Sequence, residues 1–250
     1  MQEGTFYTAL SGALALHRRM DTVANNLANA TTTGYKADRL DFGGVLSRAQ
    51  GEGRDQGLES PVVFPVLEGS ETDFGQGPLK QTGRNLDFAI EGEGFFEVRT
   101  DDGGTAYTRD GRFTLDAEGV LTDSEGRAVL DRRGRAVTLD SREVNVNASG
   151  ELFAPGHNSP VGHLAVYRPQ EPGQLQKQGD NLYQAPAETM AEATEARVRN
   201  GHLERSNVNT MQEMVRMMDL QRAYQSMTQA MKTINEAYSE SGQRLANPGR

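Results

Sequence analysis

Residues 217–238, MMDLQRAYQSMTQAMKTINEAY, decide the fold. Their larger apolar side chains recur at alternating steps of three and four residues, which is the a/d pattern of a helix that packs along another helix. The pattern occupies seven positions: Met217, Leu220, Tyr224, Met227, Met231, Ile234 and Tyr238. No Gly or Pro interrupts residues 210–241, so the sequence predicts one long helix that needs a helical partner.

The start of this helix carries a capping signal. Thr210 and Glu213 fit the T-x-x-E capping box, in which the two side chains satisfy backbone N–H groups of the first turn. Asn209 is another candidate for the N-cap, because asparagine is strongly preferred there. We therefore expect the helix to begin close to residue 210.

A comparable stripe lies at the opposite end of the chain. It steps by four and three residues through Phe6, Leu10, Ala13, His17, Met20, Ala24 and Leu27. This predicts a helix over the first thirty residues that ends before Thr31, with Gly34 as its stop. Two such helices predict an antiparallel, coiled-coil-like pair that carries an inserted domain. A helical hairpin that merely closes one globular domain remains an alternative.

The sequence between the helices has a different period. From about residue 74, short apolar runs alternate with glycines 103, 111, 119, 126 and 134, which are seven or eight residues apart. Such spacing is typical of a meander of tight hairpins, so we expect an all-β domain, sandwich or barrel-like. Residues 171–202 are polar and rich in turn signals. The predicted class is α+β.

The expected domains follow from these changes of pattern. Residues 1–30 and 203–250 form a terminal helical assembly domain, and residues 74–202 form a β-rich outer domain. Residues 31–73 form a loop-rich connector. Within this connector, Arg48 to Ser60 is a polar loop and Val62 to Leu67 is a short strand, which Pro65 limits to an edge or a break.

Composition narrows the function classes. The chain has 250 residues, no Cys and no Trp, and a net charge of −9, which argues against nonspecific binding of nucleic acid. No apolar run of about 18 residues exists, so we expect no membrane insertion. The first residues include Glu3 and lack a basic region, which is unlike a Sec signal peptide. If the chain is exported, we expect another machine to export it.

No motif indicates catalysis, a metal or a cofactor. Gly92 and Gly94 lack the third glycine of a nucleotide loop, and the four histidines are scattered without metal-ligand spacing. The abundant carboxylates leave open a β-domain protein that binds or processes carbohydrate, although acidic surface turns explain the same residues. We therefore expect no enzyme activity and no cofactor.

Three groups of motifs resemble the bacterial flagellar rod and hook proteins. The N-terminal group is Ser11-Gly12, Ala24-Asn25-Asn26-Leu27-Ala28-Asn29 and Thr33-Gly34-Tyr35-Lys36. The middle group is the run from Gln81 to Phe96 and Tyr107-Thr108-Arg109-Asp110-Gly111. The C-terminal group is Leu203-Glu204, Ser206-Asn207-Val208-Asn209, Met214-Val215 and Gln221-Arg222-Ala223-Tyr224. The match covers both ends and much of the middle, in the order of the family.

The resemblance implies a structural subunit of the flagellar basal-body rod. The Gln-Thr-Gly-Arg-x-Leu-Asp form and the length fit the proximal rod type better than the distal type, which remains the alternative. It implies export by the flagellar type III apparatus without cleavage, and polymerisation with copies of itself and neighbouring rod proteins in the shaft that crosses the periplasm.

The expected assembly interface lies on the two helices. Three asparagines crowd one end of the N-terminal helix, although Asn is a poor helix former. Fraying would explain them, but the resemblance favours amides that bond across an interface. The full set of expected interface residues is Leu10, Asn25, Asn26, Leu27, Asn29, Met217, Leu220, Tyr224, Met227, Met231, Ile234 and Tyr238.

Overall fold

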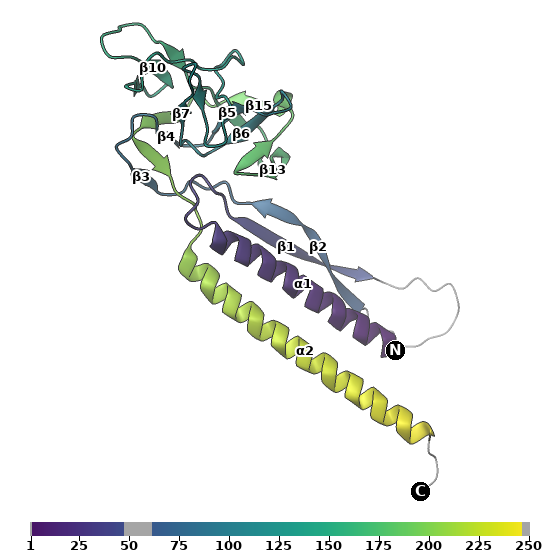
Figure 1. The fold of residues 1–250 in the computed structure, drawn as a ribbon. Helices are drawn as coiled ribbons and strands as arrows, with labels where there is room; N and C mark the ends of the chain where they lie inside the picture. Colours follow the sequence, from purple (N-terminus) through teal and green to yellow (C-terminus); the bar gives the residue numbers. More distant parts are fainter. Residues whose placement is uncertain (1, 48–61, 247–250) are drawn as a thin grey trace. The chain divides into compact units, whose positions relative to one another are not determined.

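The computed structural model describes residues 2–47 and 62–246, with side chains for 9–40, 71–171 and 173–237. The chain divides into two compact units. Unit 1 holds Met1–Ala28, Asp38–Thr72 and Asn209–Arg250, and unit 2 holds Asn29–Ala37 and Asp73–Val208. Helices lie at both ends of the sequence and the middle is mainly strand, so the predicted α+β class is confirmed (Figure 1).

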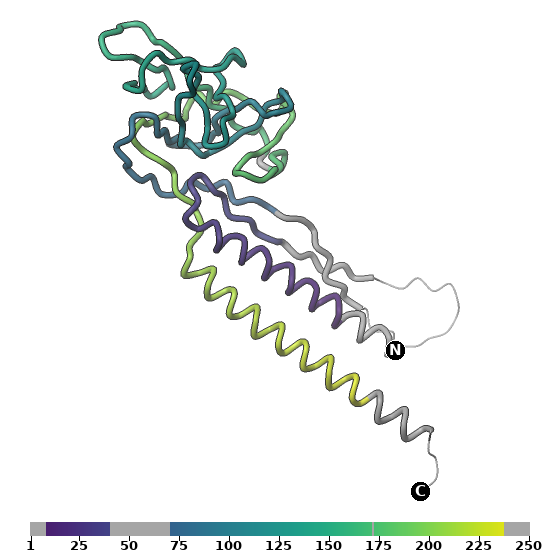
Figure 2. The backbone as a smooth tube through the Cα atoms, viewed as in Figure 1, coloured from purple at the N-terminus to yellow at the C-terminus, as the bar shows by residue number. Residues whose placement is uncertain are grey.

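Unit 1 consists of two helices and a long β-hairpin. Helix α1 spans Gln2–Ala28 and helix α2 spans Thr210–Ala246. Strand β1 (Asp38–Ser47) pairs antiparallel with β2 (Val62–Thr72), with one irregularity between Asp41 and Phe42. Figure 1 shows this hairpin alongside α1, which contacts both of its strands as well as α2. The coloured parts of the tube in Figure 2 show α1 and α2 running side by side.

This hairpin corrects the predicted loop-rich connector. The short strand expected at Val62 to Leu67 belongs to the longer β2, in which Pro65 lies opposite Gly44. Strand β1 was not predicted. The polar loop expected from Arg48 to Ser60 lies outside the described residues. The unit boundaries also differ from the expected domains, because residues 29–37 belong to unit 2 while 38–72 belong to unit 1.

The helix ends refine the capping signals. Asn209 caps α2, because its Oδ1 accepts a hydrogen bond from the Gln212 N–H at 3.2 Å. Glu213 instead pairs with Arg216 Nη1 at 2.5 Å, so the Thr210–Glu213 capping box is wrong. Helix α1 ends at Ala28, as predicted, but Gly34 is too far along the chain to be its C-cap. Gly34 has a φ of 71°, and its N–H donates a hydrogen bond to the Glu204 carbonyl inside unit 2.

Unit 2 is built from small antiparallel sheets. The largest has six strands in the order β13-β14-β6-β5-β12-β15, and a three-stranded sheet has the order β11-β10-β9. Three strand pairs complete the described sheets of this unit: β4 with β16, β3 with β17, and β7 with β8. None of these described sheets closes into a barrel. The bounds are β3 Leu79–Gln81, β4 Phe88–Glu91, β5 Phe95–Arg99, β6 Thr105–Thr108, β7 Thr114–Leu115, β8 Leu121–Thr122, β9 Asn145–Val146, β10 Glu151–Phe153, β11 Gly162–His163, β12 Val166–Pro169, β13 Gln176–Gly179, β14 Leu182–Gln184, β15 Met190–Glu192, β16 Arg197–Asn200 and β17 His202–Glu204, with single 3-10 turns at Pro172–Gln174 and Ala187–Thr189.

A threefold repeat of tight turns organises the centre of unit 2. Backbone hydrogen bonds join three residues in a closed cycle: Val129 N–H to Leu121 O at 2.8 Å, Val137 N–H to Val129 O at 2.9 Å and Leu121 N–H to Val137 O at 2.8 Å. Each of these three residues follows a tight turn that begins with an aspartate: Asp116, Asp123 and Asp131 in chain order. The Oδ1 atom of each aspartate accepts hydrogen bonds from two backbone N–H groups of its own turn. The predicted turns at Gly119, Gly126 and Gly134 are thus confirmed, whereas Gly111 lies in no turn. Of the strands expected here, 128–130 form isolated bridges and, within 137–139, only Thr138 does.

The polar segment 171–202 contains strands that the sequence pattern missed. Gly179-Asp180-Asn181 is a turn as expected, with positive φ angles at Asp180 (48°) and Asn181 (57°), as in a type I′ hairpin. The hairpin joins β13 to β14, which adds Tyr183 to an aromatic cluster with Phe74 and Phe95. Strand β13 is almost wholly exposed, so it has no alternating apolar pattern to detect.

The main core of unit 2 gathers side chains from most of its strands, among them Phe88, Phe96, Phe113, Leu121 and Leu152, each with no exposed surface. This core fixes the strands and loops from which the buried site described below is built. No helix among the described residues has the length and apolar content needed to cross a bilayer.

Candidate assembly surface and buried ion cluster

The predicted a/d positions of α2, which we call the seam, are distinguished from the rest of the helix by their lower exposure. Between 210 and 237, the half-buried side chains are Met217, Leu220, Tyr224, Met227, Met231 and Ile234, Glu213 is buried, and all others are exposed. These six are the predicted a/d positions that fall within the described side chains. Tyr238, the seventh, lies outside them.

The contacts of this seam include α1. A Cβ atom added to Gly12 would lie 3.1 Å from Met227 Cε, so glycine lets the methionine approach the helix closely. The ring centroids of His17 and Tyr224 are 6.5 Å apart in an edge-to-face arrangement. Tyr224 and Met227 therefore contact α1 within the same chain.

The predicted stripe on α1 is only partly the buried face. Ala13 is buried and Met20 and Leu27 are half-buried, but Leu10 is 40% exposed, and His17 and Ala24 are exposed. The difference has a physical cause. Helix α1 contacts the β1–β2 hairpin as well as α2, so a second direction of burial adds Val23 and Asn26 to its covered face.

Two of the asparagines near the end of α1 make hydrogen bonds within their own chain. Asn26 is 2% exposed, and its amide pairs with the backbone of Asp38 in both directions: Nδ2 donates to Asp38 O at 2.8 Å, and Oδ1 accepts from Asp38 N–H at 2.9 Å. Asn29 Oδ1 accepts from the Thr32 hydroxyl at 3.1 Å. Asn25 is exposed. The Asn26 amide therefore fastens the start of β1 to α1.

Large exposed apolar side chains gather on unit 1. Six of the seven found among the described residues are on the two helices: Leu10 and Leu14 on α1, and Met211, Met214, Val215 and Met218 on α2. The four on α2, which we call the methionine stripe, are 47–73% exposed. They lie on a different face of α2 from the seam, and the a/d analysis missed them because it followed one periodic stripe. The Met214-Val215 pair was the available signal.

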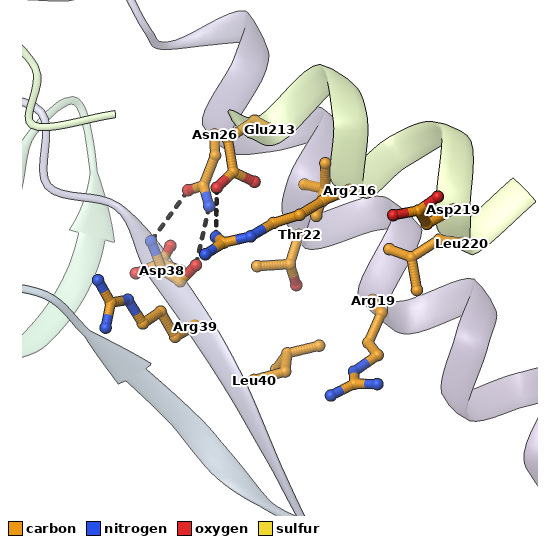
Figure 3. A pocket seen from close by; sticks show the side chains of 11 residues that line it. Arg19, Thr22, Asn26, Asp38, Arg39, Leu40, Glu213, Arg216, Asp219 and Leu220 are labelled. Atoms are coloured by element: carbon orange, nitrogen blue, oxygen red, sulfur yellow. Dashed lines mark hydrogen bonds and ion pairs between the residues drawn. The ribbon is translucent and has the colours of Figure 1, made fainter. Parts of the chain in front are cut away.

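A pocket of about 440 Å³ opens in unit 1 where α1, β1 and α2 meet (Figure 3). Its charged lining is mixed, with Arg19, Arg39 and Arg216 beside Asp38, Glu213 and Asp219. Val23, Leu40 and Leu220 provide an apolar wall. The Asn26–Asp38 and Glu213–Arg216 interactions lie at one end of the pocket in Figure 3.

Unit 2 holds a buried ion cluster that sequence reasoning did not find. Glu204 has no exposed surface, and its two carboxylate oxygens bind two buried cations. Lys36 Nζ donates to Oε1 at 2.6 Å, and Arg109 Nη1 donates to Oε2 at 3.0 Å. Lys36 and Arg109 are only 1% and 3% exposed. Burial lowers the pKa of Lys36, while the attraction of Glu204 opposes this shift.

Backbone groups complete the cluster. The Gly77 N–H donates to Glu204 Oε1 at 2.8 Å, and Lys36 Nζ also donates to the Gly75 carbonyl at 2.8 Å. The Glu204 carbonyl accepts from the Gly34 N–H at 2.8 Å. Close backbone approach requires glycine here, because a Cβ on Gly77 would lie 2.0 Å from the Arg205 carbonyl oxygen. The cluster thus joins residues 34–36, 75–77, 109 and 204.

This geometry holds chain segments together and offers no reaction centre. The polar atoms of Glu204 and Lys36 are engaged with each other, with Arg109 or with backbone groups, and no apolar substrate pocket adjoins them among the pockets described. No group of three or more His, Cys, Asp or Glu residues suited to a metal ion occurs in the described part of the chain.

Comparisons with known proteins give the cluster its context. Residues 6–36 match the family described as flagella basal body rod protein, and 199–243 match the C-terminal domain of the flagellar basal body rod FlgEFG proteins. Residues 89–154 match the flagellar hook protein FlgE/F/G D1 domain. Each matched region contributes one charged member of the cluster: Lys36, Glu204 and Arg109 respectively.

Full-length relatives agree with these matches. The flagellar basal-body rod protein FlgF of Caulobacter vibrioides is 36% identical, over 97% of this chain and 98% of the relative. The chain belongs to the flagellar basal-body rod protein family. Another member, FlgF of Rhizobium meliloti, is 36% identical over 93% of both chains, and FlgG of Bacillus subtilis is 28% identical over 94% and 97%. This rod protein is a structural subunit of the flagellum and not an enzyme.

Proposed function

We propose that this rod protein is a subunit of the proximal rod, which polymerises through the helices of unit 1 with copies of itself and with neighbouring rod proteins. The observation that carries the proposal is the concentration of six exposed large apolar side chains on α1 and α2. An isolated soluble chain has no use for such a grouping, which is typical of a surface that another protein covers.

Burial of these apolar side chains between subunits stabilises an assembly. Burying a Leu- or Met-sized side chain is worth about 1.5–3 kcal/mol when it was fully exposed before. The four side chains of the methionine stripe are about half to three-quarters exposed, so their burial between subunits offsets part of the ordering and association cost. Methionine side chains adapt to irregular gaps, which suits contacts that are only quasi-equivalent along a helical assembly.

The remaining parts of the proposal rest on family membership. We propose export by the flagellar type III apparatus without removal of an N-terminal segment, and a place in the part of the rod that crosses the periplasm. The proximal assignment is supported by the FlgF relatives compared, which are 32–36% identical, against 28–32% for the FlgG relatives. The distal rod type is the second candidate.

A substitution in the seam tests the role of the helices. Met227 is half-buried against Gly12, so Met227→Lys places a charge where it must either reach water or separate α1 from α2. We expect the variant to keep unit 2 folded but to fail in rod assembly and motility. Lys232→Glu, which changes an exposed residue outside the seam, is the control and should swim almost normally. Normal motility of Met227→Lys would refute a role for the seam.

The choice between proximal and distal rod is tested by complementation. Expression of this chain should restore rod assembly and swimming in a strain that lacks its FlgF, but not in one that lacks its FlgG. The opposite result would assign the chain to the distal rod.

A further inference from the structure

The first three turns of α2 carry two features on opposite faces. At about 100° per residue, the centre of the methionine stripe (Met211, Met214, Val215 and Met218) points about 150–170° away from Glu213, Arg216 and Leu220 and about 90° away from Asp219, and these four residues line the pocket of unit 1. The close view in Figure 3 shows these four α2 side chains on the pocket side, where Arg19, Thr22 and Asn26 of α1 also lie. The stripe of a chain therefore cannot enter its own pocket.

We propose that the methionine stripe of one copy docks into the unit 1 pocket of a second copy. The proposal rests on the proposed function and names the surfaces that make one of its subunit contacts. Because the stripe and the pocket are different surfaces of the same unit and the stripe cannot reach its own pocket, the contact is heterologous and leaves one stripe and one pocket free after each addition. Such a contact extends a filament and does not close a twofold dimer.

The chemistry of the two surfaces is complementary. The pocket offers an apolar wall of Val23, Leu40 and Leu220, and its volume of about 440 Å³ has room for more than one side chain. The stripe offers unbranched methionines that can follow the shape of that wall. Both surfaces are already present on the single chain, so docking needs no rearrangement of the fold.

A pair of opposite charges fits the same contact. Asp219 is among the residues that line the pocket, and Arg222, three residues further along α2, lies within about 40° of the centre of the stripe at about 100° per residue. Both side chains are exposed. We infer that Arg222 of the docked copy approaches Asp219 of the receiving copy, which fixes the register of the contact.

Charge reversal tests this pairing on the full-length chain. Sedimentation velocity of the wild type should show assemblies that grow with protein concentration. Asp219→Arg and Arg222→Asp should each raise the concentration required for assembly by about tenfold or more, because each creates a like-charge pair at every contact. Circular dichroism should show unchanged helix content, since both residues are exposed on α2.

Mixing the two variants gives the decisive result. In an equimolar mixture, every contact between Asp219→Arg and Arg222→Asp chains has opposite charges, so assembly should return in alternating order. Unimpaired assembly of either variant alone, or no recovery on mixing, would overturn the pairing. If the wild type does not assemble under any condition, the proposed function itself fails, which is a different outcome from the failure of this contact.

The apolar half of the contact has its own variant and control. Met218→Glu places a carboxylate in the stripe and should raise the assembly concentration by a similar factor. Val161→Glu changes the one exposed large apolar residue described outside the helices and should leave assembly unchanged. Equal behaviour of the two variants would overturn the assignment of the stripe.

Discussion

Glu204→Gln is the substitution whose consequence the structure defines most sharply. The change removes one negative charge from a site with no exposed surface and leaves Lys36 and Arg109 beside each other. Removing one partner of a buried ion pair costs about 3–5 kcal/mol, because the charge that remains is desolvated and uncompensated. Domains are stable by about 5–15 kcal/mol, so the variant should lose a large part of the stability of unit 2.

The change in stability caused by a second substitution distinguishes an effect of charge from a packing defect. Lys36→Met alone keeps the one-to-one pair of Arg109 and Glu204, and should cost only about 1–2 kcal/mol for the lost hydrogen bonds. In the Glu204→Gln background, the same change removes one of two uncompensated cations. It should therefore restore about 1 kcal/mol or more, which is a favourable coupling that a pure packing defect would not produce.

The assay is urea unfolding of the full-length chain, followed by hydrogen exchange of peptides from β4, β5 and β6. Glu91→Gln is the matched control, because it removes the same charge from the Arg199–Glu91 pair, whose side chains are 51% and 44% exposed. Exposed pairs contribute about 0–1 kcal/mol, so this control should behave almost like the wild type. A cost for Glu204→Gln no larger than that of the control, or a further loss on adding Lys36→Met, would refute the reasoning.

Three further outcomes are expected. Gly77→Ala should destabilise unit 2 severely, since the new Cβ would meet the Arg205 carbonyl oxygen at 2.0 Å, whereas Gly173→Ala, with no atom within 4 Å, should be nearly neutral by urea unfolding. Asn26→Ala should cost about 2–3 kcal/mol by removing the two hydrogen bonds that its amide makes to the Asp38 backbone, and hydrogen exchange at the start of β1 should become faster. Unchanged exchange there would exclude this role. Burial lowers the pKa of Lys36 below 10.5, so the unfolded chain keeps this proton to higher pH than the folded chain does. The contribution of Lys36 to the free energy of unfolding should therefore increase as the pH rises towards 10.5. The same dependence of stability on alkaline pH in a Lys36→Met variant would contradict this prediction.

Several features of this protein follow from local pattern and were predictable. The a/d spacing of α2 identified the six half-buried positions from Met217 to Ile234, because a helix repeats its inward face every 3.6 residues whatever it packs against. The evenly spaced glycines identified the turns at 119, 126 and 134, because the turn conformation is set by residues a few positions apart. The family motifs were readable for the same reason: each is a short continuous run.

Only the tertiary structure decided what those motifs do together. Lys36, Arg109 and Glu204 lie in three separate motifs, with Lys36 and Glu204 separated by 168 positions, and each reads in the sequence as an ordinary surface charge. The expected β-domain of 74–202 leaves out both Lys36 and Glu204, although unit 2 includes them. Likewise, Asn26 became a partner of Asp38 only because β1 returns along α1, and the pocket exists only where α1, β1 and α2 meet. Periodicity reports which way a side chain faces along its own element, whereas desolvation and pairing depend on which distant segments share that face.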